Sequence, residues 1–113
     1  EVFSADESDF YDFDAKYNNK NSKTVIPAEI DDNISDEIRS LAAKIFTALD
    51  GYGLARVDFF IEDGTNRVIF NEMNTFPGFT PISMYHMLFE ASGIDMESLL
   101  DKLIELGLDR YDR

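Results

Sequence analysis

Cysteine and tryptophan are absent from the 113-residue sequence, and histidine occurs once. The lack of cysteine excludes a disulfide framework, a thiolate metal site and a thiol nucleophile, and it is compatible with a reducing cytoplasm, where we expect the protein to act. No apolar run approaches the roughly 20 residues that a membrane span requires. The acidic first residues also lack the basic start of a signal peptide. We therefore expect no membrane partner.

Basic residues are scarce as well. Only 10 Lys and Arg stand against 23 Asp and Glu, which gives a net charge of −13 and a pI near 4.2. No Lys/Arg cluster interrupts this excess, so we expect no nucleic-acid partner. A polyanion could still bind if divalent cations lay between it and the acidic side chains. The apolar share of 44% allows one modest core, in one domain or a piece of one.

The hydrophobic pattern predicts a mixed α+β fold. The first four residues resemble the end of a strand, so we expect a fragment of a longer protein. We predict strands at 10–15, 24–26, 54–62 and 68–73, and helices at 35–49, 82–91 and 96–105. Caps are expected from Asn33 or Ser35 and from Asp95, with Gly107 ending the last helix. In the middle helix we expect His86 to be structural or exposed, and a core stripe at Met84, Met87, Leu88 and Ala91.

The segment between the two central strands predicts a β-hairpin, because Asp63-Gly64 lies between apolar runs. We predict a five-residue loop at 63–67. That loop pairs Glu62 with Val68, Phe60 with Phe70, Asp58 with Glu72, and Arg56 with Asn74. Side-chain alternation then forms a core face of Val57, Phe59, Ile61, Ile69 and Met73, with Asn71 as its one polar member. A register slip of one residue would spoil both faces.

This pairing places the carboxylates of Asp58 and Glu72 directly opposite each other, with Cβ atoms roughly 5 Å apart. Opposed like charges are destabilising unless Arg56, a bound proton or a metal ion joins them. Together with the Asn74 oxygen they form a set of hard donors that suits Mg²⁺ or Mn²⁺. Two ordinary interpretations compete with a metal site: carboxylates that simply face water, and a surface ion network with Arg56.

Three motifs carry a family resemblance. The chain reads Phe-Tyr-Asp-Phe-Asp-Ala-Lys-Tyr at 10–17, Ala-Arg-Val-Asp-Phe-Phe at 55–60 and Glu-Met-Asn-Thr-Phe-Pro-Gly at 72–78. In this order and spacing they resemble the C-terminal signature of the D-alanine–D-alanine ligases, members of the ATP-grasp superfamily. Phe70 departs from the family's usual Leu or Ile and leaves the motif residues intact. The resemblance spans nearly all of the chain.

The resemblance implies a fold and a set of site residues. It implies that residues 1–113 form the C-terminal portion of an ATP-grasp domain, with a mostly antiparallel sheet and helices packed on one face. The implied roles are Mg²⁺ ligation by Asp58, Glu72 and Asn74; oxyanion stabilisation by Arg56 and the Gly78 N–H; binding of the second substrate's carboxylate by Ser83 and Met84; closure of the site by Tyr17; and ATP binding by Phe10, Lys16 and Asn71.

The resemblance also implies the reaction. The family joins two D-amino acids with ATP through an acyl phosphate, for peptidoglycan precursor synthesis, and uses two Mg²⁺ ions for which Mn²⁺ can substitute. ATP and D-alanine are the implied ligands, and the complete enzyme is expected to be a homodimer. Because the N-terminal and central domains are missing, we expect these 113 residues alone to be inactive and to expose apolar surface.

Three alternatives stay open at this point. The second substrate could be D-serine or D-lactate in place of D-alanine, as in the relatives that confer vancomycin resistance. The chain could be a non-catalytic acidic module that binds Ca²⁺ or Mg²⁺. It could also belong to another ATP-dependent carboxylate–amine ligase, although the Pro77-Gly78 and Ser83 matches count against this.

Overall fold

The computed structural model describes residues 2–3 and 23–112. Its elements, in chain order, are β1 (Val2–Phe3), β2 (Lys23–Thr24), α1 (Asp32–Ala48), β3 (Arg56–Ile61), β4 (Val68–Asn74), α2 (Met84–Ala91) and α3 (Met96–Tyr111). The strand predicted at 10–15 lies outside the described residues. In the described part of the chain, no helix combines the length and the apolar character that a bilayer crossing demands.

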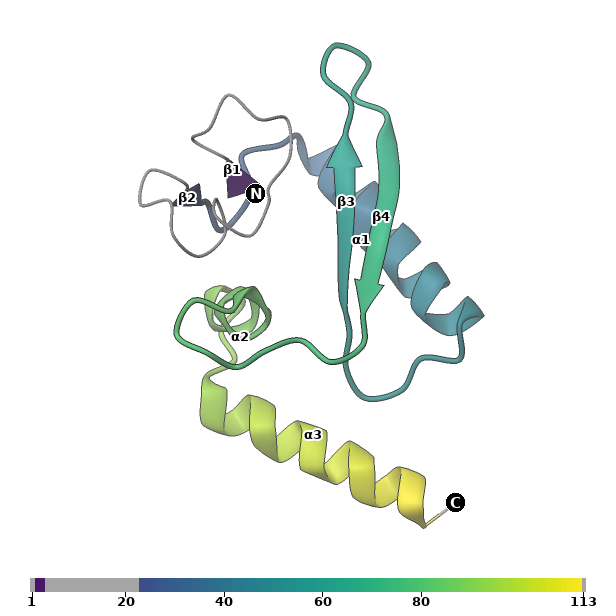
Figure 1. Cartoon of the computed structure of the whole chain (residues 1–113), viewed down its shortest axis with the longest axis vertical. Coiled ribbons are helices and arrows are strands. Elements are labelled where there is room, and N and C mark those ends of the chain that lie inside the picture. Colours follow the sequence, from purple (N-terminus) through teal and green to yellow (C-terminus); the bar gives the residue numbers. More distant parts are fainter. Residues whose placement is uncertain (1, 4–22, 113) are drawn as a thin grey trace.

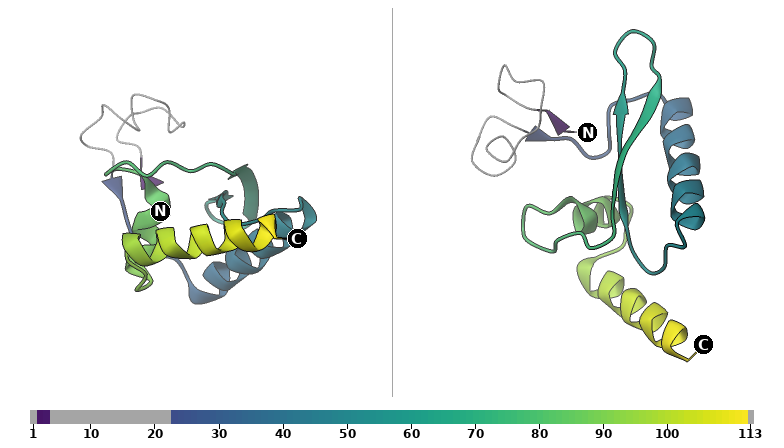
Figure 2. Two further views of the ribbon diagram at one scale, coloured as in Figure 1. Left: turned by 90° about the horizontal axis from the view of Figure 1, so that it is seen from below. Right: turned by 45° about the vertical axis from the view of Figure 1, so that its right-hand side comes forward.

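The strands form two separate antiparallel pairs, β1 with β2 and β3 with β4. Helix α1 runs along one face of the β3–β4 hairpin, whereas α2 and α3 lie beyond the end at which β3 begins and β4 ends (Figures 1 and 2). The α+β prediction is therefore confirmed. The expectation of helices packed on one face holds for α1 and is wrong for α2 and α3.

Helix α1 begins three residues earlier than predicted. Its N-cap is Asp31, whose side chain makes no capping hydrogen bond, and the first turn is closed by the Ser35 N–H donating to the Asp31 carbonyl at 3.0 Å. The prediction of Asn33 or Ser35 as cap is wrong, because both residues lie inside the helix. An acidic first turn suits the positive end of the helix dipole, which favours the earlier start.

Helix α2 buries residues other than the predicted stripe. Its buried members are Tyr85 and His86, while Leu88 and Ala91 are exposed. The ring of Tyr85 makes edge-to-face contacts with Phe79 and Phe89, at centroid distances of 5.7 and 5.1 Å. Contacts from the preceding loop thus decide which face of this short helix is covered. The same burial raises the pKa of the Tyr85 phenol above its ordinary value of 10.0.

Helix α3 continues through Gly107, where we expected it to end. A glycine inside a helix costs about 1 kcal/mol relative to alanine. Tertiary contacts hold the added turn: the Tyr52 hydroxyl donates to Asp109 Oδ2 at 2.8 Å, and the Arg110 guanidinium lies 5.0 Å from the centre of the Tyr52 ring. The helix therefore ends where its contacts with the turn after α1 end.

The start of α3 was predicted correctly. Asp95 caps it, with the Ser98 N–H donating to Asp95 Oδ1 at 2.8 Å, and this hydrogen bond lowers the pKa of the Asp95 carboxyl below its ordinary value of 3.8.

An alanine at position 95 removes this cap, so we expect Asp95→Ala to lower the melting temperature at pH 7. Because the pKa is lowered in the folded state, the carboxylate stabilises the fold above its unfolded pKa, and the effect is lost as the pH falls through the folded pKa. The gap between wild type and Asp95→Ala should therefore close in acid below pH 3.8. Asp95→Asn keeps the acceptor without the charge and is the control. An undiminished gap at low pH would contradict this.

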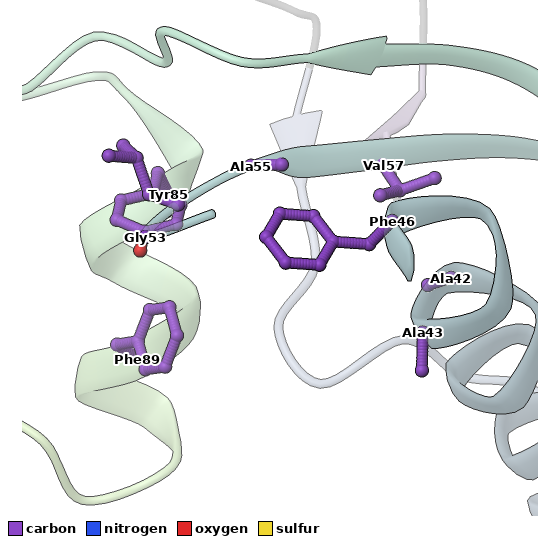
Figure 3. A pocket seen from close by; sticks show the side chains of 9 residues that line it. Ala42, Ala43, Phe46, Gly53, Ala55, Val57, Tyr85 and Phe89 are labelled. Carbon is purple, nitrogen blue, oxygen red and sulfur yellow. The ribbon is translucent and has the colours of Figure 1, made fainter. Parts of the chain in front are cut away.

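The core of the described region is small. Its buried apolar residues are Tyr85, Leu99 and Pro77, of which Pro77 is fully covered. Phe76, Tyr111 and Ile104 are 90%, 87% and 62% exposed. An open apolar cavity of about 270 Å³ lies between α1, the start of β3 and α2. Figure 3 shows Phe46 of α1 directed toward the α2 rings of Tyr85 and Phe89 across it. None of the residues that line the cavity is charged.

Candidate functional site

The hairpin brings Asp58 and Glu72 directly opposite each other, as predicted. The pairs Arg56–Asn74, Val57–Met73 and Asp58–Glu72 all have the expected register. Val57 lines the cavity against α1, so alternation places Asp58 and Glu72 on the face that points away from that helix. The two carboxylates therefore share the open face of the sheet.

The turn half of the hairpin differs from the prediction. The Glu62 N–H donates to the Arg67 carbonyl at 2.9 Å, so the loop has four residues, 63–66, where we predicted five. Gly64 and Asn66 adopt φ angles of 84° and 56° there. The pairs beyond Asp58 are shifted accordingly: Phe59 faces Phe70, Phe60 faces Ile69 and Ile61 faces Val68. The predicted pairs Glu62–Val68 and Phe60–Phe70 are therefore wrong.

A β-bulge reconciles the two halves. The register shifts between Asp58 and Phe59, which leaves Asn71 as an extra residue of β4 between the partners of those two residues. Ile69 thus joins Phe60 on the open face instead of the core face, and Phe70 joins Phe59, with ring centroids 6.0 Å apart. The bulge absorbs the odd residue of the short loop and keeps the carboxylates paired.

Arg56 joins the carboxylate pair from the same strand as Asp58. Its Nε and Nη2 donate to Asp58 Oδ1 and Oδ2 at 2.9 and 3.0 Å, which is a bidentate fork. The side chains are 11% and 29% exposed, so the bond is stronger than a surface ion pair. The ion network that we considered as an alternative to a metal site is thus present between Arg56 and Asp58. Two carboxylates against one guanidinium still leave one negative charge, and Glu72 is exposed.

Asn74 lies at the end of β4, opposite Arg56. Its Oδ1 accepts a hydrogen bond from the Phe76 N–H at 3.0 Å, which turns the chain toward the buried Pro77. A carbonyl oxygen has a second lone pair, so this turn is compatible with cation binding. Asp58, Glu72 and Asn74 therefore fit the donor set of Mg²⁺. The described residues contain no group of three or more His, Asp or Glu side chains that could hold a metal ion.

The loop after Pro77 brings Gly78 against Ser83. A Cβ atom at Gly78 would lie 2.9 Å from Ser83 Oγ, closer than such contacts ordinarily allow. The backbone at Gly78 therefore lies beside the Ser83 hydroxyl because there is no side chain between them. Two residues that we predicted from separate motifs are adjacent.

Ser83 occupies the N-cap position of α2 without making a capping hydrogen bond. Its Oγ instead accepts from the Thr80 N–H at 3.0 Å and lies 2.7 Å from Thr80 Oγ1. Met84 is the first residue of α2, and the N–H groups of a first helical turn have no partner within the helix. Ser83 and Met84 thus lie at the positive end of this helix.

The sequence analysis did not identify Thr80 as a functional residue, and it assigned no specific contact to His86. Thr80 holds Ser83, and His86 is buried and contacts the Thr80 carbonyl through Nε2 at 2.8 Å. The Thr-x-x-Ser spacing was a usable signal, because Ser and Thr side chains readily bond to nearby backbone. Asn71 is exposed at the bulge. The remaining predicted site residues, Phe10, Lys16 and Tyr17, lie outside the described residues.

Comparisons with known proteins agree on one family. Residues 2–105 match the family model described as D-ala D-ala ligase C-terminus. The D-alanine–D-alanine ligase of Prochlorococcus marinus (strain MIT 9301) is 52% identical over 103 residues, which cover 91% of this chain and 29% of the relative. D-alanine–D-alanine ligase B of Clostridium tetani (strain Massachusetts / E88) is 54% identical over 101 residues, which cover 89% of this chain and 28% of the relative. The chain thus spans less than a third of the length of these relatives.

Solved structures are similar over most of the chain. The D-alanine–D-alanine ligase from Coxiella burnetii superposes with a TM-score of 0.74 at 42% identity, covering 80% of this chain and 25% of that protein. The VanG D-Ala:D-Ser ligase from Enterococcus faecalis superposes with a TM-score of 0.73 at 39% identity, covering 94% and 29%. Because the family model matches nearly the whole sequence, this chain belongs to the D-alanine–D-alanine ligase C-terminal family.

Proposed function

We propose that this chain is the part of a D-alanine–D-alanine ligase that holds the nucleotide's metal ions and the second substrate. The observation that carries the proposal is the pairing of Asp58 with Glu72 on the open face of the hairpin, beside the Arg56 fork. The ATP-grasp assignment of the fold belongs to the same proposal. The family match favours this function over that of a non-catalytic acidic module.

In the first proposed step, the carboxylate of one D-alanine attacks the γ-phosphate of ATP, and an acyl phosphate forms as ADP leaves. An anion must approach a polyanion, so negative charge has to be neutralised. Asp58, Glu72 and Asn74 would hold two Mg²⁺ ions, for which Mn²⁺ can substitute, and the ions would supply that neutralisation when bound. The residues themselves fix the position of the site, because two paired strands carry them.

In the second proposed step, the amine of the other D-alanine attacks the acyl carbon, and phosphate leaves. Negative charge develops on the carbonyl oxygen, and Arg56 with the Gly78 N–H would stabilise it. The fork to Asp58 fixes the plane of the guanidinium before the reaction, as such stabilisation requires. Ser83 and the Met84 N–H would bind the carboxylate of the attacking D-alanine at the start of α2.

Four further roles complete the proposal. Phe10, Lys16 and Asn71 would contact ATP, with Lys16 near the γ-phosphate, and Tyr17 would help to close the site over the second substrate. The complete enzyme is expected to be a cytoplasmic homodimer that supplies peptidoglycan precursor synthesis.

The test is an assay of the complete ligase that contains this chain. We expect formation of D-alanyl-D-alanine that requires ATP and Mg²⁺, with Mg²⁺ binding more tightly when ATP is present. The isolated 113 residues should give no product, since they lack the rest of the nucleotide site. A complete protein that binds Ca²⁺ without any coupling to ATP, and that forms no dipeptide, would refute the proposal.

A second candidate is ligation of D-alanine to D-serine, favoured by the similarity to the VanG D-Ala:D-Ser ligase over 94% of this chain. Competition between D-alanine, D-serine and D-lactate as the second substrate would separate the candidates. We expect kcat/KM to be highest for D-alanine. A higher value for D-serine or D-lactate would transfer the assignment to that variant and leave the metal site unaffected.

A methyl group at position 78 tests the contact with Ser83. We expect Gly78→Ala to raise KM for the second D-alanine roughly tenfold, because the added Cβ would displace the Ser83 hydroxyl that lies 2.9 Å away. Initial-rate kinetics at saturating ATP would measure this. Gly107→Ala, within helix α3 where a Cβ meets open space and the backbone is helical, is the control for activity. Equal KM values for Gly78→Ala and wild type would contradict the expectation.

A further inference from the structure

His86 is the buried polar side chain of the described region, at 7% exposure. Its Nε2 lies 2.8 Å from the Thr80 carbonyl oxygen. A carbonyl oxygen can only accept a hydrogen bond, so Nε2 must carry the hydrogen. The other ring nitrogen, Nδ1, is buried without a hydrogen-bond partner, and Glu90 Oε1 is 3.8 Å away from it. Nε2 is therefore the ring nitrogen that donates a hydrogen bond, and its acceptor is the Thr80 carbonyl oxygen.

The acceptor of the His86 hydrogen bond lies in a turn that further hydrogen bonds between Thr80 and Ser83 hold in place. The Thr80 carbonyl also accepts from the Ser83 N–H at 3.0 Å, while the Thr80 N–H and Oγ1 both contact Ser83 Oγ, at 3.0 and 2.7 Å. Every polar atom of Thr80 thus takes part in fixing Ser83. Among the described residues, His86 supplies the hydrogen bond that ties this turn to the body of α2.

The imidazole ring is itself held in place. Phe79 stacks on it, with centroids 6.5 Å apart and planes inclined by 16°, and the edge-to-face contact with Tyr85 holds Phe79 in turn. The aromatic contacts fix the ring, the ring fixes the Thr80 carbonyl, and the turn fixes the Ser83 hydroxyl. With Thr80 Oγ1 as the donor of their shared hydrogen bond, the Ser83 hydroxyl keeps its own hydrogen for an incoming anion.

We propose that His86 is a positioning residue for the second substrate, acting through Thr80 on Ser83. The inference rests on the proposed function, in which Ser83 binds the carboxylate of the attacking D-amino acid. His86 does not touch substrate in this scheme. Its hydrogen bond sets the position of the turn and so the affinity for that substrate, without taking part in phosphoryl transfer.

The test uses the complete ligase and variants that separate the ring from its hydrogen bond. His86→Phe keeps the stacking on Phe79 and loses the donor, so we expect KM for the second D-alanine to rise roughly tenfold, with kcat and KM for ATP nearly unchanged. His86→Gln offers a donor again and should recover most of the loss. Glu90→Gln changes the neighbour of Nδ1 alone and is the matched control, expected to behave like wild type.

A double-mutant experiment with Ser83 adds a measurement whose result general destabilisation would not change. In a Ser83→Ala background, His86→Phe should produce little further change in KM, because both substitutions act on the same contact. Independent, additive effects would overturn the proposal, as would an unchanged KM in an active His86→Phe enzyme. If His86→Phe fails to fold, nitrogen NMR of the wild-type ring decides: a hydrogen on Nε2 supports the proposal, and one on Nδ1 alone overturns it. A wild-type enzyme without ligase activity would instead refute the proposed function.

Discussion

Replacing Glu72 by Gln in the complete ligase should lower kcat by about a thousandfold, equivalent to some 4 kcal/mol of transition-state stabilisation. The substitution keeps the shape of the side chain and removes one of the two negative charges that face each other across β3 and β4. Fewer negative oxygens would then hold the metal ions of the proposed site. Steady-state kinetics over a range of Mg²⁺ concentrations would measure the loss, and higher Mg²⁺ should not restore full activity.

The same substitution should leave the folded state intact or make it more stable. Directly opposed like charges destabilise a sheet, so Glu72→Gln relieves repulsion with Asp58 when no metal is bound. A loss of activity without a loss of stability would distinguish a functional carboxylate from a structural one. Glu62→Gln is the matched control: this side chain is 40% exposed and pairs with Arg67 at 3.1 Å beside the hairpin loop, away from the proposed site. If Glu72→Gln retained kcat within a few-fold of wild type, the metal site would have to be abandoned.

Replacing Arg56 by Lys should lower kcat by about a hundredfold, or roughly 3 kcal/mol, although the charge is conserved. Lysine is a point charge on a flexible stem and cannot form the two parallel bonds that Arg56 makes to Asp58 at 2.9 and 3.0 Å. The proposed oxyanion donor would lose its fixed orientation, and Asp58 would lose one of the two hydrogen bonds that it accepts from residue 56. Single-turnover kinetics would locate the loss in the chemical steps.

Arg67→Lys provides the comparison for this second prediction. Arg67 forms a single bond to Glu62 and is 67% exposed, whereas the Arg56 side chain is 11% exposed. Exposed ion pairs contribute about 0–1 kcal/mol, so Arg67→Lys should change neither kcat nor the melting temperature appreciably. Full activity in Arg56→Lys would show that a positive charge alone suffices, and the role of the planar fork would be withdrawn.

The hairpin shows how a correct site can accompany a wrong loop. Residue alternation placed Asp58 opposite Glu72, and this is the register observed. The loop length followed from assuming one register throughout, and the structure uses a shorter loop with a bulge at Asn71 instead. A bulge depends on local backbone hydrogen bonding between two strands, and alternation along one strand carries no signal for it.

The helices also combine features that the sequence predicts with features that depend on tertiary contacts. The cap of α3 at Asp95 was predictable because capping is local, between residues three apart. Its passage through Gly107 was not, since Tyr52 reaches Asp109 from 57 residues away. Likewise, the burial of His86 depends on Phe79 and Thr80 folding back over α2.

The sequence by itself determined the acidic character, the motif residues from Arg56 to Ser83 and the paired carboxylates, because these depend on composition and on short-range alternation. Only the tertiary structure decided that Gly78 lies against Ser83, that a bulge keeps the carboxylate register, and that His86 holds the Thr80 turn. Each of these arises where separate segments meet, and packing between segments depends on their shapes and orientations in space, which a linear pattern does not encode.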